Sequence, residues 1–294
     1  MLWFKCDEII PGVAIGILVI AICMGFTLVS LEYSDTVEDS VYRMAEGVET
    51  EYDSFRAQNH SVFLLGYTGE VGKAILKEMA CLKLFKKVTL IGRRGVVLGP
   101  EFGPEFEQKV VDFEKLDEFV DVFKDHSIGI SCLGTTRGKS GAKGFVRVDH
   151  DYVLSAAELA KSVGCSHFNL VSSMSANKNA FFLYPRTKGQ VEDALKVIHF
   201  DRTSIFRPGV LLCDREESRP GEAFIRSFLK PVAYFFPTAI STPTDVVARA
   251  ILNNIVAKSE NKVEMYENKA IFALAGTKTC AENKNETEEG QKEK

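Results

Sequence analysis

The chain has 294 residues, of which 46% are hydrophobic and 26% charged, with 22 Gly and 9 Pro. This composition excludes wholesale disorder and a collagen-like or low-complexity protein, and the length suits about one large α/β domain. The formal net charge of −4, from 36 basic and 40 acidic residues, gives no global electrostatic reason to bind nucleic acid. We therefore expect a globular protein that does not bind nucleic acid directly.

The N-terminal region contains a long apolar run. After a leader of residues 1–8, residues 9–31 carry no charged side chain, and a helix needs about 20 apolar residues to cross a bilayer. We predict a transmembrane anchor here. A signal peptide is the alternative, but it requires a positive leader, and here Lys5 stands beside Asp7 and Glu8. A buried soluble helix is a second alternative.

The seven cysteines are scattered and form no C-x-x-C pair, which suggests neither a metal site nor a disulfide framework. Reduced thiols favour a cytosolic environment. We therefore expect a single-pass membrane protein with a cytosolic catalytic body. Cytoplasm and nuclear envelope are the alternative if residues 9–31 do not insert. The triplets at Asn59 and Asn285 would be glycosylated only in a lumenal body.

Two segments flank the expected body, residues 59–276. Residues 32–58 are acidic and have apolar residues three or four apart, which predicts an amphipathic helical neck. Residues 277–294 are rich in charges of both signs and poor in apolar residues, which predicts a disordered tail. Either segment is a candidate contact for a protein partner.

The body alternates short β-rich runs with helical patterns, which indicates a doubly wound, Rossmann-like parallel sheet of the α/β class, preceded by the transmembrane helix. The expected strands cover residues 61–65, 88–91, 109–111, 128–133, 167–171 and 203–206. Residues 210–243 depart from this alternation and are rich in aromatics, so we expect a lid and a lipophilic carbonyl substrate. Packing against the core is the alternative. Asp245 is expected to cap a helix over residues 246–256.

The first expected strand runs into the sequence GYTGEVG, residues 66–72, and a helical pattern follows. Gly66 allows a tight turn, Gly69 lets the backbone approach a pyrophosphate, and Gly72 lets helix and strand pack closely. The N-terminus of the helix would then face the phosphates of a dinucleotide. The intervening members of this expected site are Thr68, Glu70 and Val71. An ordinary glycine turn is the alternative.

The second expected strand ends at Arg93 and Arg94, where an NAD site usually has an acid. Two guanidinium groups suit a 2′-phosphate, so we predict NADP(H) as the cofactor. A solvated basic strand end is the alternative. Asp112 is expected either to bind adenine or to cap a helix. After the fourth strand, a turn at Leu133, Gly134 and Thr135 is expected to pass under the cofactor, although turn chemistry alone also explains it.

The chemical centre of the prediction follows the fifth strand, which ends in Ser172 and Ser173. Tyr184 and Lys188 lie four residues apart and share a helix face, so Lys188 can favour ionisation of the Tyr184 hydroxyl. Tyr184 could then donate a proton to a carbonyl oxygen while a serine orients that oxygen. We assign this role to Ser173, with Ser172 as the alternative. Because a Tyr-x-x-x-Lys match arises easily by chance, its position after the fifth strand carries the prediction.

These motifs, with GRR, CLGTT and the Arg207-Pro208-Gly209 turn, resemble the atypical branch of the short-chain dehydrogenase/reductase superfamily over about residues 61–256. The strings VVDFEKLD, SAAELAKSVGCSHFNL and FRPGVLLCDREESRPGE are similar to the Tat-interacting protein family of oxidoreductase-like tumour suppressors. The resemblance implies an NADPH-binding Rossmann fold, cofactor contacts at Arg207 and Pro208, and the Ser/Tyr/Lys roles given above. Asp149 stands where related members often have Asn, which puts an Asn-dependent proton relay in question.

Two functions follow from these patterns. The first is a membrane-anchored, NADPH-dependent oxidoreductase of the carbonyl reductase type, with an unknown substrate. The alternative is an NADPH-binding regulatory protein with little or no turnover. The resemblance implies that such a protein controls growth, apoptosis or transport through protein partners.

Overall fold

The computed structural model describes residues 50–212 and 241–276. The chain divides into two compact units, Met1–Asp53 and Ser54–Lys294. Residues 50–57 are helical. The predicted leader, anchor and tail, and most of the predicted neck and lid, lie outside the described residues.

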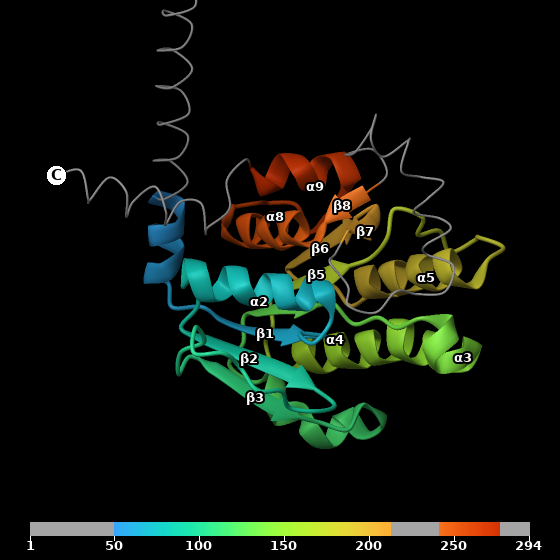
Figure 1. Cartoon of the computed structure of the whole chain (residues 1–294), viewed down its shortest axis with the longest axis horizontal. Helices are drawn as coiled ribbons and strands as arrows, with labels where there is room; N and C mark the ends of the chain where they lie inside the picture. Colours follow the sequence, from blue (N-terminus) through green and yellow to red (C-terminus); the bar gives the residue numbers. More distant parts are fainter. Residues whose placement is uncertain (1–49, 213–240, 277–294) are drawn as a thin grey trace, which may run out of the picture. The chain divides into compact units, whose positions relative to one another are not determined.

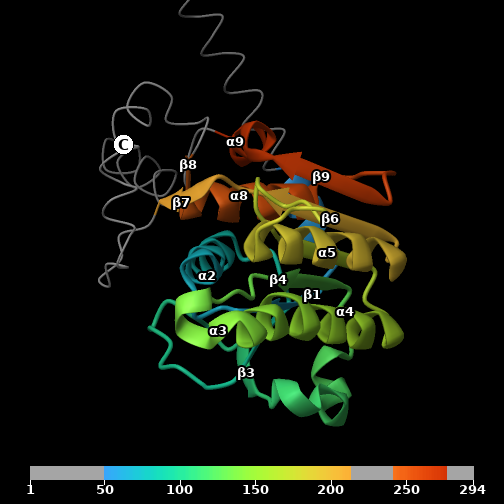
Figure 2. The same cartoon turned by 90° about the vertical axis from the view of Figure 1, so that its right-hand side faces the viewer.

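The second unit contains a seven-stranded parallel sheet with the order β3-β2-β1-β4-β5-β6-β9 (Figure 1 and Figure 2). Its strands are β1 (Ser61–Leu65), β2 (Lys87–Gly92), β3 (Phe106–Val110), β4 (Ile128–Ser131), β5 (His167–Val171), β6 (Arg202–Arg207) and β9 (Val263–Glu267). The chain builds the sheet outward from β1 in one direction and then from β4 in the other. The point between β1 and β4, where Leu65 pairs with Ser131, is therefore a topological switch point. The predicted α/β class with a doubly wound parallel sheet is confirmed.

Helices cover both faces of the sheet (Figure 2). One layer consists of α2 (Glu70–Leu82), α8 (Thr244–Val256) and α9 (Asn268–Ala275), which pack against one another. The other contains α3 (Arg137–Val146), the π-helical turn η3 (Arg147–Asp151), α4 (Tyr152–Ser162), α5 (Leu183–Val197) and the 3₁₀ segment η2 (Phe113–Phe123). Because both faces are covered, the inner strands are largely buried, and every residue of β5 is buried, including the polar His167 and Asn169.

The structure adds strands that the sequence patterns did not predict. β9 is missed because its sequence, VEMYE, carries two acids and no continuous apolar run. Its acidic side chains are nevertheless paired, Glu264 with Arg202 at 3.0 Å and Glu267 with Arg207 at 2.8 Å. A short parallel pair, β7 (Val210–Leu212) with β8 (Ser241–Pro243), borders the segment predicted to be a lid.

Two further predictions need correction. Asp245 does not cap α8, because Pro243 occupies the cap position and the Asp245 carboxylate accepts a hydrogen bond from Arg249 at 2.8 Å. The transmembrane part of the predicted fold class is not supported. No helix within residues 50–212 and 241–276 is both long and apolar enough to cross a bilayer, and residues 9–31 lie outside that part.

Candidate dinucleotide-binding cleft

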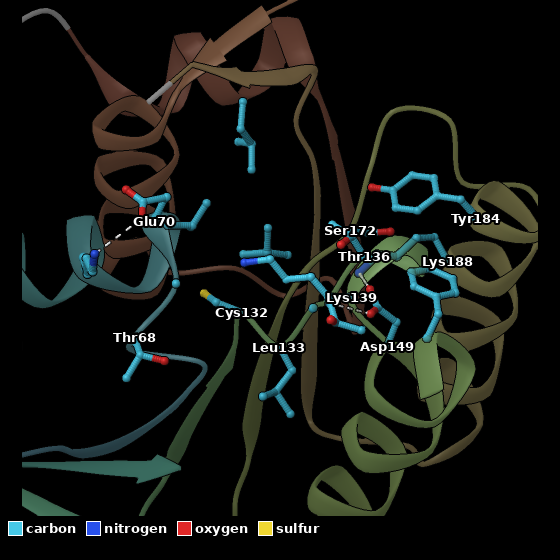
Figure 3. A pocket seen from close by; sticks show the side chains of 18 of the residues that line it. Thr68, Glu70, Cys132, Leu133, Thr136, Lys139, Asp149, Ser172, Tyr184 and Lys188 are labelled. Carbon is cyan, nitrogen blue, oxygen red and sulfur yellow. Dashed lines mark hydrogen bonds and ion pairs between the residues drawn. The ribbon is translucent and has the colours of Figure 1, made fainter. Parts of the chain in front are cut away.

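A cleft of about 1200 Å³ opens where β1, β4 and β5 end, at the switch point of the sheet (Figure 3). It is lined by the loop after β1, the first turns of α2, the loop after β4, the end of β5 and the start of α5. Ligand pockets usually measure roughly 300–1,000 Å³. The cleft is therefore large enough for an extended ligand such as a dinucleotide.

The glycine loop forms one wall of the cleft, and its geometry requires glycine at two positions. Gly66 has φ +80°, and a Cβ there would lie 2.6 Å from the carbonyl group of Cys132. A Cβ on Gly72 would collide with the backbone of Gly66. Gly69 precedes α2, and no side chain caps the first-turn amides of this helix. These amides are available to an anion.

The structure places Thr68, Glu70 and Val71 in the lining of the same wall. It adds positive side chains that the sequence analysis missed, Lys73 and Lys77 on α2 and Lys139 on α3. The spacing of Lys73 and Lys77, one helical turn apart just after the glycine loop, was the available signal. Lys73 is only loosely paired, with its Nζ 3.4 Å from Glu70.

Arg93 and Arg94 follow β2 and are exposed, outside the lining of the cleft. Neither side chain has an ion pair among the described residues. The Arg94 carbonyl accepts a hydrogen bond from the hydroxyl of Tyr67 at 2.8 Å, which fixes the backbone of this turn. Asp112 caps η2, because its Oδ1 accepts the Glu114 N–H at 2.9 Å.

Arg207 and Pro208 are not brought to the cleft lining. The Arg207 guanidinium donates to both carboxylate oxygens of Glu192, at 3.0 and 2.6 Å, and pairs with Glu267 as well. These hydrogen bonds raise the pKa of Arg207. The Pro208 carbonyl accepts the Met174 N–H at 3.0 Å. In this structure both residues therefore make intramolecular contacts outside the cleft lining.

Tyr184 and Lys188 face the cleft from the first turns of α5. Tyr184 is 46% exposed, its ring centroid lies 5.8 Å from that of Phe145, and its hydroxyl points into the cleft (Figure 3). Pro185 occupies the first turn of the helix, where a missing N–H costs nothing. The structure therefore brings the predicted Tyr/Lys pair to the wall opposite the glycine loop.

Lys188 is only 5% exposed and is held by Asp149, which is 1% exposed. The Lys188 Nζ lies 2.9 Å from Asp149 Oδ1, and Asp149 Oδ2 accepts the Thr135 N–H at 2.8 Å. Burial by itself lowers the pKa of Lys188, but Asp149, Tyr184 and Cys132 together outweigh it and raise that pKa. Asp149 also joins Lys188 to the loop of Leu133, Gly134 and Thr135, which lines the cleft.

The two serines after β5 differ in position. Ser172 is buried and lines the cleft, and its hydroxyl donates a hydrogen bond to Glu192. Ser173 does not belong to the lining, and its hydroxyl oxygen lies 3.1 Å from that of Ser175. The tertiary position thus favours the serine that the sequence analysis named as the alternative.

The cysteines give no nucleophile at the site. Cys132 lines the cleft with a free thiol, and burial raises its pKa to about 12, so it stays protonated at neutral pH. Cys165 is also free, whereas Cys81 is disulfide-bonded. The expectation of reduced thiols therefore fails at Cys81. In the described part of the chain, no group of His, Cys, Asp and Glu is arranged to hold a metal ion.

No family model matches the chain. Among curated proteins, Protein HTATIP2 of Rattus norvegicus is 53% identical over 222 residues, which cover 76% of this chain and 92% of the rat protein. Protein fmp52, mitochondrial, of Aspergillus niger is 34% identical over 209 residues, covering 66% of this chain and 86% of that protein.

Solved structures share the fold at low sequence identity. A short-chain dehydrogenase of Leptospira borgpetersenii with bound NAD+ has a TM-score of 0.57 at 14% identity, covering 73% of this chain and 92% of that one. MoeE5 in complex with UDP-glucose and NAD has a TM-score of 0.54 at 14% identity, covering 70% of this chain and 75% of that one.

The sheet order and the cleft at the switch point define a Rossmann-like α/β protein, and the short-chain dehydrogenase structure with bound NAD+ shares this fold. At the level of the individual protein, the similarity to the rat protein extends over nearly its whole length. The chain belongs to the HTATIP2 family.

The comparisons correct the predicted localisation. A single-pass membrane protein with a cytosolic body is not supported, because the fungal relatives from Aspergillus niger and Scheffersomyces stipitis are named as mitochondrial proteins. The part of the chain that the structure describes offers no membrane-spanning helix in its favour.

Proposed function

We propose that the protein is an NADPH-dependent oxidoreductase of the carbonyl reductase type, with a substrate still to be identified. The observation that carries this proposal is the placement of Tyr184 and the buried Lys188 across the cleft from the glycine loop. Structures with the same fold that were solved with NAD support a nicotinamide dinucleotide as the cofactor class.

The residues present fit such a cofactor. Gly66 and Gly72 allow a backbone turn that any Cβ would block, and the amides of the first turn of α2 lack side-chain caps. Lys73 and Lys77 add positive charge on the same side of the cleft. When bound, the reduced cofactor supplies a hydride to a carbonyl carbon. Arg93 and Arg94 favour NADPH over NADH, because two guanidinium groups without an ion pair among the described residues suit a 2′-phosphate.

The protein's own residues handle the proton and the orientation of the substrate. The Tyr184 hydroxyl donates its proton to the carbonyl oxygen. Lys188 remains charged beside it and has further N–H donors for a ribose hydroxyl, since the ion pair with Asp149 uses only part of its donor capacity. The Ser172 hydroxyl orients the carbonyl oxygen by turning from Glu192, which stays paired with Arg207.

Several apolar side chains line the cleft, which supports a lipophilic carbonyl compound as the substrate. The apolar side chains in the cleft lining are Phe145, Val171, Phe182, Leu183 and Leu211. A substrate screen tests the proposal: wild-type protein with NADPH and a panel of aldehydes and ketones, with NADPH absorbance as the readout. Turnover that Tyr184→Phe abolishes supports it. Turnover that this substitution leaves unchanged refutes the role of Tyr184.

The alternative is an NADPH-binding regulatory protein that acts through protein partners. The observation in its favour is the exposure of Phe181 at 89% and Phe182 at 73%, next to the cleft and Tyr184. Aromatic side chains exposed together often belong to a binding surface. This function predicts NADPH binding without turnover of any carbonyl compound, and a Phe181→Ser/Phe182→Ser variant that binds NADPH normally but captures fewer partners.

A further inference from the structure

Asp149 joins two walls of the cleft through one carboxylate. It lies in η3, the π-helical turn between α3 and α4. Its Oδ1 contacts the Lys188 ammonium at 2.9 Å, and its Oδ2 accepts the Thr135 N–H at 2.8 Å. One side chain thus connects the loop after β4 to α5, although the three residues lie far apart in the sequence.

The surroundings of this contact explain why a carboxylate is needed. Lys188 is almost completely buried, and a buried ammonium is costly unless a charge balances it. The described groups that act on it are Asp149 from η3, Tyr184 from its own helix and the Cys132 thiol after β4. The Cys132 thiol is protonated. Asp149 therefore supplies the negative charge that offsets burial.

The glycine at position 134 brings the loop close to this carboxylate. A Cβ on Gly134 would lie 3.4 Å from Asp149 Oδ1, in van der Waals contact with it. An asparagine at position 149 would have the same shape but a single acceptor oxygen and no charge. It could satisfy Lys188 or Thr135, but not both, and it could not balance the ammonium.

We propose that Asp149 is a positioning residue that keeps Lys188 charged and fixes it to the Thr135 loop, so that the lysine and the loop present one rigid surface to the cofactor. The coupling to the cofactor rests on the proposed function, whereas the coupling between Asp149 and Lys188 does not. Asp149 does not itself touch the reacting atoms.

The first test uses full-length protein without cofactor and four forms: wild type, D149N, K188M and D149N/K188M. The readout is the thermal unfolding midpoint between pH 6.5 and 9.5. D149N is expected to lose stability most at neutral pH, where Lys188 is left charged, buried and unbalanced. Without Asp149, burial lowers the pKa of Lys188, so the unfolded state binds more protons than the folded state and stability rises with pH. The difference in unfolding midpoint between D149N and wild type should therefore become smaller towards pH 9.5.

The double variant distinguishes an interaction between Asp149 and Lys188 from a general loss of stability caused by the Asp149 substitution. Because it removes both charges, D149N/K188M is expected to be more stable at neutral pH than D149N. If D149N does not fold while the double variant does, the proposal is supported. The proposal is overturned if the double variant is no more stable than D149N and the difference in unfolding midpoint between D149N and wild type stays constant with pH. Asp193→Asn on α5 is the matched control, since Asp193 forms surface pairs with Lys178 and Lys196.

The second test measures the dissociation constant for NADPH by fluorescence over the same pH range. D149N, or the double variant if D149N does not fold, is expected to bind roughly tenfold more weakly than wild type, because the charged donor of Lys188 is lost or misplaced. For D149N the loss should grow as pH rises. If a variant with an altered unfolding profile binds NADPH as tightly as wild type does, the coupling between Asp149 and cofactor binding is refuted. Absence of binding by wild type would refute the proposed function, while the unfolding cycle would still decide the role of Asp149.

Discussion

The hydroxyl of Ser172 donates a hydrogen bond to the carboxylate of Glu192. Arg207 binds the same carboxylate through two nitrogens, so Glu192 stays paired when Ser172 turns away. The buried serine that follows β5 can therefore redirect its hydroxyl hydrogen bond to a ligand without leaving the Glu192 carboxylate unpaired. Ser173, one residue later, lies outside the lining of the cleft.

From this arrangement we expect Ser172→Ala to slow carbonyl reduction by roughly 10²-fold, the usual effect of losing a donor to the reacting oxygen. Its cost in folding free energy should be about 1 kcal/mol. Ser173→Ala should stay close to wild type. Initial rates of NADPH oxidation measure both effects. A large loss with Ser173→Ala and none with Ser172→Ala would return the role to Ser173.

Tyr184→Phe is expected to reduce turnover by about 10²–10⁴-fold, because the proton donor is removed. NADPH affinity should change little, since the ring and its contact with Phe145 remain. Tyr266→Phe is the matched control, because the Tyr266 hydroxyl bonds Asn254 at 2.7 Å on the edge strand, outside the cleft lining. Equal losses in the two variants would indicate a general effect on stability.

Arg93→Ala/Arg94→Ala is expected to weaken NADPH binding by about 1.5–3 kcal/mol, the usual worth of hydrogen bonds to charged groups. NADH binding should be unchanged, because NADH lacks the 2′-phosphate that these side chains would contact. Calorimetric titration of both cofactors measures the difference, and NADH serves as the internal control. Equal affinities of the wild type for the two cofactors would rule out this assignment.

Gly66→Ala is expected to abolish cofactor binding and to destabilise the fold. The positive φ costs an alanine about 1–2 kcal/mol, and the collision with Cys132 adds about 1–3 kcal/mol. Gly138→Ala is the control, because its Cβ would meet no atom within 4 Å. That change should be neutral or stabilise α3 by up to about 1 kcal/mol. Denaturant unfolding compares the two variants, and equal stability would contradict the requirement for glycine at position 66.

Acid is expected to destabilise the protein through His167. Burial lowers the pKa of His167 to about 3, from an ordinary value of 6.5. Below pH 6.5 the unfolded state therefore binds a proton that the folded state excludes, and each pH unit down to about 3 costs up to about 1.4 kcal/mol. His167→Gln should flatten the unfolding free energy over this range. An unchanged slope would assign the acid sensitivity to other groups.

The sequence alone determined the features that depend on local spacing. Six of the seven strands of the main sheet could be predicted from short β-rich runs, although β3 begins at Phe106 and not at the predicted residue 109. The glycine loop could be predicted because Gly66, Gly69 and Gly72 stand between a strand and a helix. Tyr184 and Lys188 were predicted to share a helix face because they lie one turn apart. Each of these inferences needs only the period of a helix or strand and the order of elements along the chain.

Only the tertiary structure decided which distant residues meet. The pairing of Asp149 with Lys188, the placement of Ser172 in the cleft lining and the pairing of Arg207 with Glu192 join elements that the sheet order brings together. β9 was missed for the same reason, since its acids are matched by arginines of β6. The burial of a side chain and the pairing of its charge depend on how the chain packs in three dimensions. The partner of a buried polar side chain can therefore be identified only when the order of the strands in the sheet is known.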